Sequence, residues 1–259
     1  MPRIKIGEDL LYFEDRGGDM STGAVFLLVH GAAGSSQQWL PVVETLEKDH
    51  RVISLDLPGH GNSNGRGSRS VDSYVGVVRA FTSTINLSNF ILCGHSLGGA
   101  IAMGYALKNP RDLSGLVLIS TGARLKVSPL FLETCLEGNM EKLRVLLSKL
   151  AFYHGIPLAR IHKWQQQWGY PPREVLYGDF LACNSFDYME EVEKIQTPTL
   201  IIAGDDDRMT PLKYAYYLTE KIKGSTLEVI PDSGHMLMAE KPREISRLLS
   251  GFARGISEA

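Results

Sequence analysis

The chain has 259 residues, of which 44% are hydrophobic, and a formal net charge of −2 at pH 7. This length fits one large α/β domain or two small ones, and this apolar fraction can build a sizeable core. The near-neutral charge argues against nucleic acid as a partner, because proteins that bind phosphate backbones carry a basic patch.

The N-terminal residues, the apolar runs and the cysteines indicate in which cellular compartment the protein is expected. The first residues contain no apolar stretch that fits a signal peptide, and no run is apolar enough to span a bilayer. We therefore expect a soluble, cytoplasmic protein with no membrane partner. Cys93, Cys135 and Cys183 form no C-x-x-C pair and are odd in number, which suits small buried hydrophobes in a reducing compartment. Redox and zinc chemistry are disfavoured.

Short apolar runs alternate with segments of helical periodicity, which predicts a mostly parallel central sheet flanked by helices. The predicted strands are 24–29, 51–55, 90–93, 116–119, 199–203 and 227–230. Apolar residues at helical spacing predict one-sided helices over 39–46, after Ser70 and behind Pro242. Further helices are expected over 97–109 and 210–222, the second opened by Thr210-Pro211.

The loop Val29-His30-Gly31-Ala32-Ala33-Gly34 follows the first long strand. Such a loop can present a backbone N–H, here that of Ala32, to a developing anion. The alternative is a glycine turn that merely starts a helix. Further along, Gly59 and Gly61 hint at dinucleotide binding. That interpretation is disfavoured because Asn64 stands where the third glycine should be and no helix begins there.

The segment Gly94-His95-Ser96-Leu97-Gly98 fits G-x-S-x-G between a predicted strand and a predicted helix. A serine on a sharp strand-to-helix turn has a strained backbone, and the flanking glycines let neighbouring chain approach without a Cβ clash. Ser96 is therefore the candidate nucleophile. The helix begins here, so its free N–H groups point where an oxyanion would form. The Leu97 N–H, with that of Ala32, would complete a two-donor oxyanion hole.

Residues 124–190 interrupt the alternation of strands and helices. They contain no strand-like run but hold ten of the 22 aromatic residues of the chain. Leucines at 143, 146, 147 and 150 mark one amphipathic helix, and 169–172 interrupts a second. We expect an inserted helical cap, or lid, at 124–190, and a core domain made of 1–123 and 191–259.

An acidic cluster, Asp205-Asp206-Asp207, follows the strand predicted at 199–203. It stands at a carboxyl end of the sheet, where open α/β sheets build their sites. One buried carboxylate is enough to orient a catalytic histidine, because its bond to the far ring N–H fixes the tautomer. The alternative is that all three are solvated turn residues or cap the next helix. Spacing alone does not choose among them.

His235 lies on a glycine-flanked loop after the last predicted strand and is the candidate general base. His95 adjoins Ser96, but on a tight elbow its side chain should point away from the serine hydroxyl, so it is disfavoured as the base. The histidines outside these motifs are interpreted as surface or loop residues: His50, His60, His154 and His162.

With these residues in place, the chain resembles the α/β-hydrolase superfamily over essentially its whole length, and its serine carboxylesterase-like members in particular. Five segments carry the resemblance: His30-Gly31, Asp56 to Ser63, Gly94 to Gly98, Gly204 with Asp207 and Pro211, and Gly234-His235 with Glu240 and Pro242. The resemblance implies an α/β-hydrolase fold with the cap between the sixth and seventh strands. It selects Asp207 from the three aspartates. Haloalkane dehalogenases and epoxide hydrolases of this fold carry an aspartate where this chain has Ser96, so those activities are disfavoured.

The sequence thus predicts a carboxylesterase-type serine hydrolase with Ser96, His235 and Asp207 as its triad. It implies no cofactor and no metal. The expected partner is a small-molecule ester with an apolar acyl or alkyl group, and the expected state is a monomer or small homo-oligomer. Phe152 and Trp164 are candidates for the pocket wall, with packing inside the cap as the alternative. A lactonase, thioesterase, C–C bond hydrolase or cofactor-free perhydrolase would share the triad, and a low-turnover ligand-binding receptor is the alternative outside the enzymes.

Overall fold

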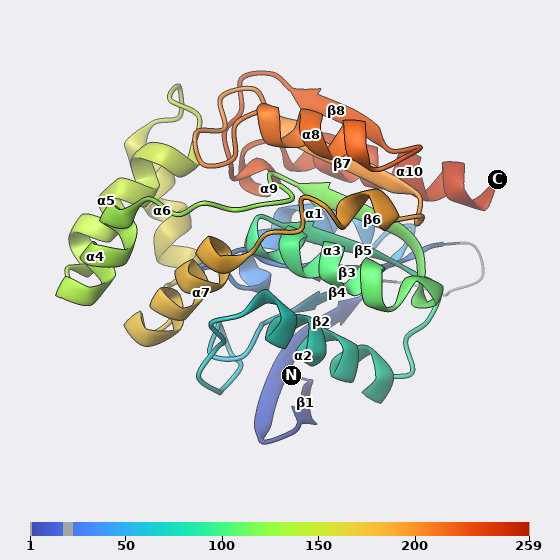
Figure 1. Cartoon of the computed structure of the whole chain (residues 1–259), viewed down its shortest axis with the longest axis horizontal. Helices are drawn as coiled ribbons and strands as arrows, with labels where there is room; N and C mark the ends of the chain where they lie inside the picture. Colours follow the sequence, from blue (N-terminus) through green and yellow to red (C-terminus); the bar gives the residue numbers. More distant parts are fainter. Residues whose placement is uncertain (1, 18–22, 259) are drawn as a thin grey trace.

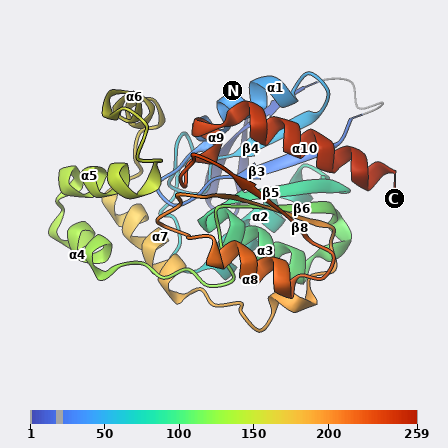
Figure 2. The ribbon, with the colours of Figure 1, turned by 90° about the horizontal axis from the view of Figure 1, so that it is seen from above.

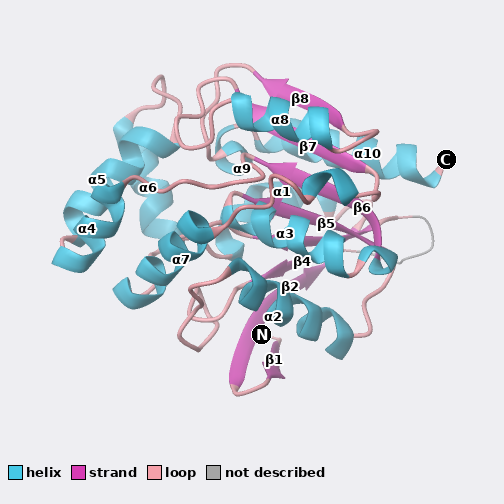
Figure 3. Ribbon diagram, viewed as in Figure 1, coloured by secondary structure: helices cyan, strands magenta, loops and turns pink. Residues whose placement is uncertain are grey.

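A computed structural model of the chain describes residues 2–17 and 23–258; Met1 and Ala259, the outer ends predicted for the core domain, lie outside the described residues. Within these ranges one sheet of eight strands forms the centre of the molecule, in the order β1-β2-β4-β3-β5-β6-β7-β8 (Figures 1 and 3). The strands are β1 Arg3–Ile6, β2 Asp9–Arg16, β3 Val25–Val29, β4 Arg51–Leu55, β5 Phe90–His95, β6 Leu113–Ile119, β7 Thr199–Gly204 and β8 Thr226–Ile230.

All six predicted strands are present, and they pair in parallel from β4 to β8. The first two strands were not predicted. β1 and β2 form an antiparallel hairpin, and β2 pairs antiparallel with β4 at that end of the sheet. Only Leu11 and Tyr12 of these two strands are buried, and the other residues are half-buried or exposed. Their sequence therefore lacks the continuous apolar run that marks a strand buried on both faces.

Two layers of helices cover the sheet (Figure 2). Helices α1 Leu40–Leu46 and α10 Pro242–Ser257 lie on one face, and α2 Val71–Thr84, α3 Leu97–Lys108 and α8 Lys213–Lys221 lie on the other. Successive strand residues point to opposite faces of the sheet and pack against different helices. Leu27 packs on the side of α2 and α3, and Leu28 packs on the side of α1 and α10. The mostly parallel, helix-flanked α/β fold is thereby confirmed.

One predicted helix start is wrong. Helix α8 begins at Lys213 and not at Thr210. The Thr210 hydroxyl does not cap this helix, because it donates instead to Asp207 Oδ2 at 2.8 Å.

Four α-helices lie between β6 and β7 in sequence, and they gather beyond the carboxyl ends of the parallel strands, at the left of Figure 1. They are α4 Pro129–Glu137, α5 Met140–Ala151, α6 Leu158–Trp168 and α7 Arg173–Ser185. The leucine pattern corresponds to α5, and 169–172 separates α6 from α7. Helix α4 was not predicted. Apolar side chains of α4, α5 and α7 form a small core of their own, with Leu143 and Leu176 at its centre.

The three cysteines are free and buried, as expected. None of the helices in the described ranges combines the length and apolar character that crossing a membrane requires.

Candidate active site

Ser96 stands on the turn between β5 and α3, with φ 53° and ψ −114°. Non-glycine residues rarely adopt such angles. The glycines on either side are required by contact with backbone. A Cβ on Gly94 would lie 2.1 Å from the Gly98 carbonyl oxygen, and a Cβ on Gly98 would lie 2.3 Å from the Val29 carbonyl oxygen. The G-x-S-x-G spacing therefore reflects close packing of this turn against β3.

The loops after β7 and β8 bring Asp207 and His235 together. His235 Nδ1 lies 2.8 Å from Asp207 Oδ2, and both side chains are almost completely buried. A carboxylate oxygen can only accept, so Nδ1 carries the proton in the neutral ring. That leaves Nε2 as the nitrogen that can accept a proton.

The Asp207 carboxylate is held at both oxygens. Oδ1 accepts from the backbone N–H groups of Met209 and Thr210 at 2.9 and 2.8 Å, and Oδ2 accepts from the Thr210 hydroxyl as well as from His235. Burial raises the pKa of this carboxyl, but the facing His235 ring and these donors lower it more, so the net pKa lies below the ordinary value. Asp207 therefore stays ionised and fixed in orientation.

The two neighbouring aspartates bind elsewhere. Asp205 Oδ1 accepts the Ser233 N–H at 3.3 Å, and Asp206 Oδ2 accepts from His154 Nδ1 at 3.0 Å and from Arg208 at 3.1 Å. Neither carboxylate contacts the His235 ring. The geometry thus brings only the third aspartate to His235.

Two side chains that the sequence did not single out for this purpose hold the His235 loop. Glu240 accepts the backbone N–H groups of Gly234 at 2.9 Å and Met236 at 3.2 Å. His95 Nε2 lies 3.0 Å from the His235 carbonyl oxygen and must donate to it. His95 is thus turned toward the loop of His235, and burial followed by the nearby His235 lowers its pKa to about 3. His95 is a neutral donor.

The predicted oxyanion donors lie beside Ser96. Gly31 to Gly34 form a turn closed by the Gly34 N–H and the Gly31 carbonyl at 3.1 Å, with Ala32 and Ala33 between them. Within the described residues, neither the Ala32 N–H nor the Leu97 N–H has a hydrogen-bond acceptor. Two free donors next to a serine hydroxyl suit the stabilisation of a developing oxyanion.

The Asp56 to Ser63 segment has a structural role. Asp56 is fully buried, and its two carboxylate oxygens accept the N–H groups of Ser36 at 2.6 Å and Asn62 at 2.8 Å. Burial raises its pKa, with these bonds acting against the rise. A Cβ on Gly61 would lie 2.2 Å from the carboxylate. Of the two glycines that hinted at a dinucleotide, Gly61 is thus packed against the carboxylate of Asp56, and Gly59 against Val175 and the backbone of Gly65 and Gly67.

The interpretation of His60 as a surface or loop residue is wrong about its exposure. His60 lies on a loop but is fully buried. Asp179 of α7 lies 2.8 Å from its Nε2, and this carboxylate offsets the free-energy cost of burying a charged ring. His50 is also buried, against Phe26. Asp179 itself, separated from His60 by 119 positions, had no signal in the sequence.

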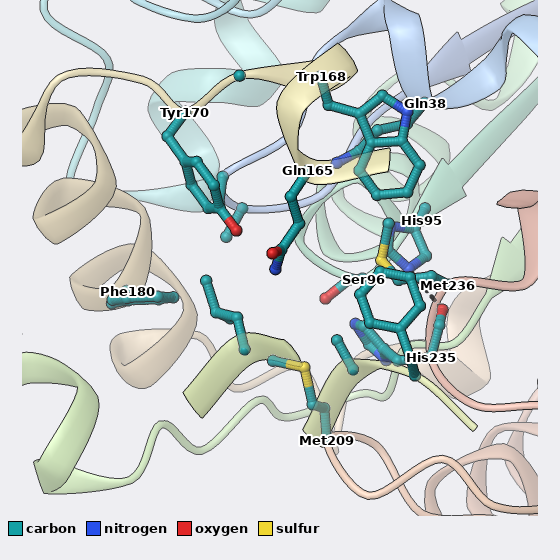
Figure 4. Close-up of a pocket in the computed structure, with 16 residues that line it drawn as sticks. Gln38, His95, Ser96, Gln165, Trp168, Tyr170, Phe180, Met209, His235 and Met236 are labelled. Carbon is teal, nitrogen blue, oxygen red and sulfur yellow. Dashed lines mark hydrogen bonds between the residues drawn. The ribbon is translucent and has the colours of Figure 1, made fainter. Parts of the chain in front are cut away.

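Two cavities meet at Ser96. The first holds about 60 Å³, and Figure 4 shows Ser96 and His235 on one side of it and Tyr170 and Phe180 on the other. The second holds about 160 Å³ and shares Ser96, Ala32, Phe180 and Met209 with the first.

Only one of the two predicted pocket residues lines either of these two cavities. Phe152 lines the smaller one. Trp164 lines neither; it stacks behind Phe152, with ring centres 5.6 Å apart and planes 15° apart. Within the described ranges, no group of three or more histidine, cysteine or carboxylate side chains is arranged to hold a metal ion.

The chain belongs to the family of the alpha/beta hydrolase fold, whose family model matches residues 24–242. Monoacylglycerol lipase abhd6-A of Xenopus laevis is 28% identical over 257 residues, which cover 88% of this chain and 75% of that protein. A putative carbamate hydrolase RutD of Rhizobium rhizogenes is 24% identical and covers 96% of this chain and 99% of its own length. Among solved structures, a thermophilic esterase from Thermogutta terrifontis superposes with a TM-score of 0.86 at 26% identity over 99% of each chain.

The low pKa of His95 predicts a loss of stability in acid. In the unfolded chain an imidazole titrates near pH 6.5, whereas folded His95 titrates at about 3. Between these values the unfolded state binds one more proton, so stability falls as pH falls below about 6.5.

His95→Gln keeps an N–H donor but cannot titrate. From about pH 7.5 to about pH 5, wild type should lose about 2 kcal/mol more of its free energy of unfolding than this variant. Urea titrations at both pH values measure the difference, and equal losses would contradict the prediction.

Proposed function

We propose that this protein is a serine hydrolase that cleaves carboxylic esters through an acyl-enzyme. Ser96 Oγ attacks the ester carbonyl while His235 Nε2 takes the hydroxyl proton, and the Ala32 and Leu97 N–H groups bind the resulting oxyanion. His235 returns the proton to the departing alcohol. Water then repeats the sequence: it gives its proton to His235, attacks the acyl carbon, and releases the acid with Ser96 restored.

The observation that carries the proposal is the strained Ser96, which shares a cavity with His235, the ring that the buried Asp207 carboxylate holds. A nucleophile, a base with a fixed tautomer and two free N–H donors are the parts that acyl transfer needs. Relatives named as esterases and lipases support hydrolysis as the reaction class.

The two cavities at Ser96 suit an ester as the substrate. An ester has an acyl group on one side of the attacked carbonyl group and an alkoxy group on the other, and each cavity would hold one of them. The walls of the smaller cavity are mostly apolar and include Phe152, Trp168 and Met236. Burial of each methylene in such a wall contributes about 0.8 kcal/mol. We therefore propose an apolar acyl or alkyl group on the substrate, and we assign residues 124–190 to a cap that closes both cavities.

Ser96 should be the residue that a fluorophosphonate probe labels, because only an activated serine attacks this reagent at a useful rate. Peptide mass spectrometry locates the adduct, and turnover of an activated ester is measured in parallel. Labelling that persists in Ser96→Ala, or active enzyme that is not labelled, would sink the nucleophile assignment.

Asp207→Asn should lower kcat by about 10⁴-fold, as loss of the correct tautomer does in the Ser-His-Asp example from which this figure is taken. The backbone donors of Met209 and Thr210 require the amide oxygen at the Oδ1 position. The amide NH₂ must then face His235 Nδ1, which becomes an acceptor, and Nε2 carries the proton. Nε2 can no longer take the proton of Ser96.

Asp206→Asn is the matched control, because it also removes one negative charge and its carboxylate contacts His154 and Arg208 instead. It should keep kcat within about 3-fold, since exposed ion pairs contribute little. Kinetics of both variants on one activated ester decide the matter. A sensitive Asp206 beside a tolerant Asp207 would refute the assignment.

Phe152→Leu should shift the preferred acyl or alkyl chain toward longer groups, because it removes part of the wall of the 60 Å³ cavity. Trp164→Leu removes a side chain of similar character that stands behind Phe152, and it should shift the preference less. Values of kcat/KM for 4-nitrophenyl esters of increasing chain length measure both effects. Equal profiles for the two variants would favour a role for Phe152 in packing alone.

A further inference from the structure

The two cavities at Ser96 differ in charge. Among the described residues, no lysine, arginine, aspartate or glutamate lines the smaller cavity. Lys126 and Arg208 line the larger one together with Ser96. A substrate group that extends from Ser96 into the larger cavity therefore meets positive charge, whereas a group in the smaller cavity does not.

A third cavity, of about 300 Å³, adjoins the larger one and continues its positive charge. The two cavities share Lys126 and Tyr214, and Arg124 and Lys213 line the third cavity as well. We call this third cavity, with its three cations, the basic groove. Within residues 2–17 and 23–258, no aspartate or glutamate lines the larger cavity or the groove. Four cations of a chain whose net charge is −2 thus lie along one side of the nucleophile.

The basic groove lies where the chain enters and leaves the helices between β6 and β7. Arg124 and Asp187 form an isolated antiparallel bridge between the two passing segments, and their side chains lie 3.4 Å apart. The Tyr214 ring of α8 packs against Gly122, where a Cβ would lie 2.2 Å from the ring. Backbone pairing and close packing thus hold the segment that carries Lys126 in place.

Two of the four cations have no partner of opposite charge. The two arginines are paired with Asp206 at 3.1 Å and Asp187 at 3.4 Å. Lys126 and Lys213 form no ion pair with any carboxylate in the described part of the chain. Lys126 Nζ donates to the Asn184 carbonyl oxygen at 3.4 Å, which uses one of the three donors of an ammonium group. Both lysines can therefore bind an anion from outside the chain.

Helix α8 adds to the positive potential of the groove. Lys213 is its first residue, and its first turn has neither an acidic residue nor a side-chain cap. The N-terminal end of a helix carries partial positive charge, so a lysine there is unfavourable unless an anion neutralises it. The next residue, Tyr214, lines both cavities, and its hydroxyl has no hydrogen-bond partner among the described residues. An anion at this place would satisfy the lysine, the hydroxyl and the helix end together.

We propose that the substrate is an ester with a negatively charged group, a carboxylate or a phosphate, several carbon atoms from its ester bond. The inference rests on the proposed function and adds the charge of the substrate to it. Leu125, Phe131 and Leu150 line the larger cavity and suit an apolar linker. Lys126 and Lys213 bind the anion at the far end of that linker. The apolar group proposed above occupies the smaller cavity, which has no charged wall.

The test compares esters that differ only in the charge of one end. In the acyl series, 4-nitrophenyl monoesters of adipic, suberic and sebacic acid are compared with the corresponding terminal amides. In the alkoxy series, acetate esters of ω-hydroxy acids of the same lengths are compared with their amides, and release of acetic acid is followed by titration at constant pH. For at least one length in one series, kcat/KM of the carboxylate should exceed that of the amide by about 10-fold, since two exposed ion pairs contribute about 3-fold each. The series that responds identifies the side of the ester that enters the larger cavity.

Lys126→Met and Lys213→Met keep an apolar stem and remove the charge. Each should lower the ratio of kcat/KM for the carboxylate over the amide by about 3-fold, and the double variant by about 10-fold. Raising the ionic strength from about 0.05 M to about 1 M should also lower the wild-type ratio, because the screening length falls to about 3 Å at 1 M. A lysine that only packs against α7 would affect both esters alike and leave the ratio unchanged.

Lys149→Met is the matched control, because it removes the same charge from an exposed lysine of α5 that lines neither the larger cavity nor the groove. Its ratio should stay within about 1.5-fold of wild type, since the contribution of an exposed charge outside the site is small. Replacing the carboxylate of the best ester by a phosphate then identifies the anion, because the group that fits the two lysines better gives the higher kcat/KM.

The inference is overturned if no length in either series favours the carboxylate, or if the preference survives in the double lysine variant. Should the double variant fail to fold, the single variants and the salt dependence decide. Active wild type without a preference for the anion overturns this inference alone. Wild-type protein that turns over none of the esters and is not labelled at Ser96 overturns the proposed function together with it.

Discussion

A serine at φ 53° and ψ −114° keeps that conformation only where the surrounding chain leaves it no other. Here the restraint is close packing of backbone on backbone at the end of β5. Gly98 lies against the carbonyl of Val29 on the neighbouring strand, and Gly94 lies against Gly98. The pairing of β3 with β5 therefore sets the position of the Ser96 hydroxyl, and the Gly31 to Gly34 turn that follows β3 lies beside it. The register of β3 against β5 therefore also fixes where Ser96 and the Gly31 to Gly34 turn lie relative to each other.

The loops at the carboxyl edge of the sheet have no ladder to satisfy their backbone N–H groups, and buried or half-buried carboxylates accept hydrogen bonds from these groups instead. Asp56 holds the segments around Ser36 and Asn62. Glu240 holds the loop of His235. Asp207 holds the chain after β7 through Oδ1 and also accepts a hydrogen bond from His235 through Oδ2. Each carboxylate organises an irregular segment that carries or adjoins a group of the site. The acidic residues of the family motifs thus determine backbone shape as much as they supply charge.

The parallel strands and the elbow could be predicted because their signals are local. A continuous apolar run marks a doubly buried strand, and the residues of G-x-S-x-G lie within two positions of Ser96, although one of the contacts that they reflect is with Val29 of β3. The choice of Asp207 needed the family resemblance, since the three aspartates are equivalent by spacing and differ only in which loop they face. β1 and β2 were missed because they are only partly buried. Thr210 was expected to open a helix, but its hydroxyl is engaged by Asp207.

The residues that sequence reasoning missed or misread depend on partners far along the chain. His60 looked exposed because histidine on a loop usually is, and its buried state follows from a carboxylate 119 positions away. His95 was set aside as a base, yet its ring donates to the backbone of His235, 140 positions away. A single sequence carries no pattern for such pairs, because both members are isolated polar residues without periodicity.

The helices between β6 and β7 do more than cover the site. The carbonyl of Ala151, the last residue of α5, accepts the N–H groups of His235 and Met236 at 3.0 and 3.1 Å. Asp179 of α7 accepts the N–H of Ala33 next to the predicted oxyanion donor. Two of the four helices therefore touch the backbone of the groups that would perform the chemistry. Displacing α5 and α7 together would remove hydrogen bonds from the backbone of His235 and from the Gly31 to Gly34 turn, so in the proposed mechanism the arrangement of these helices bears on catalysis as well as on access to Ser96.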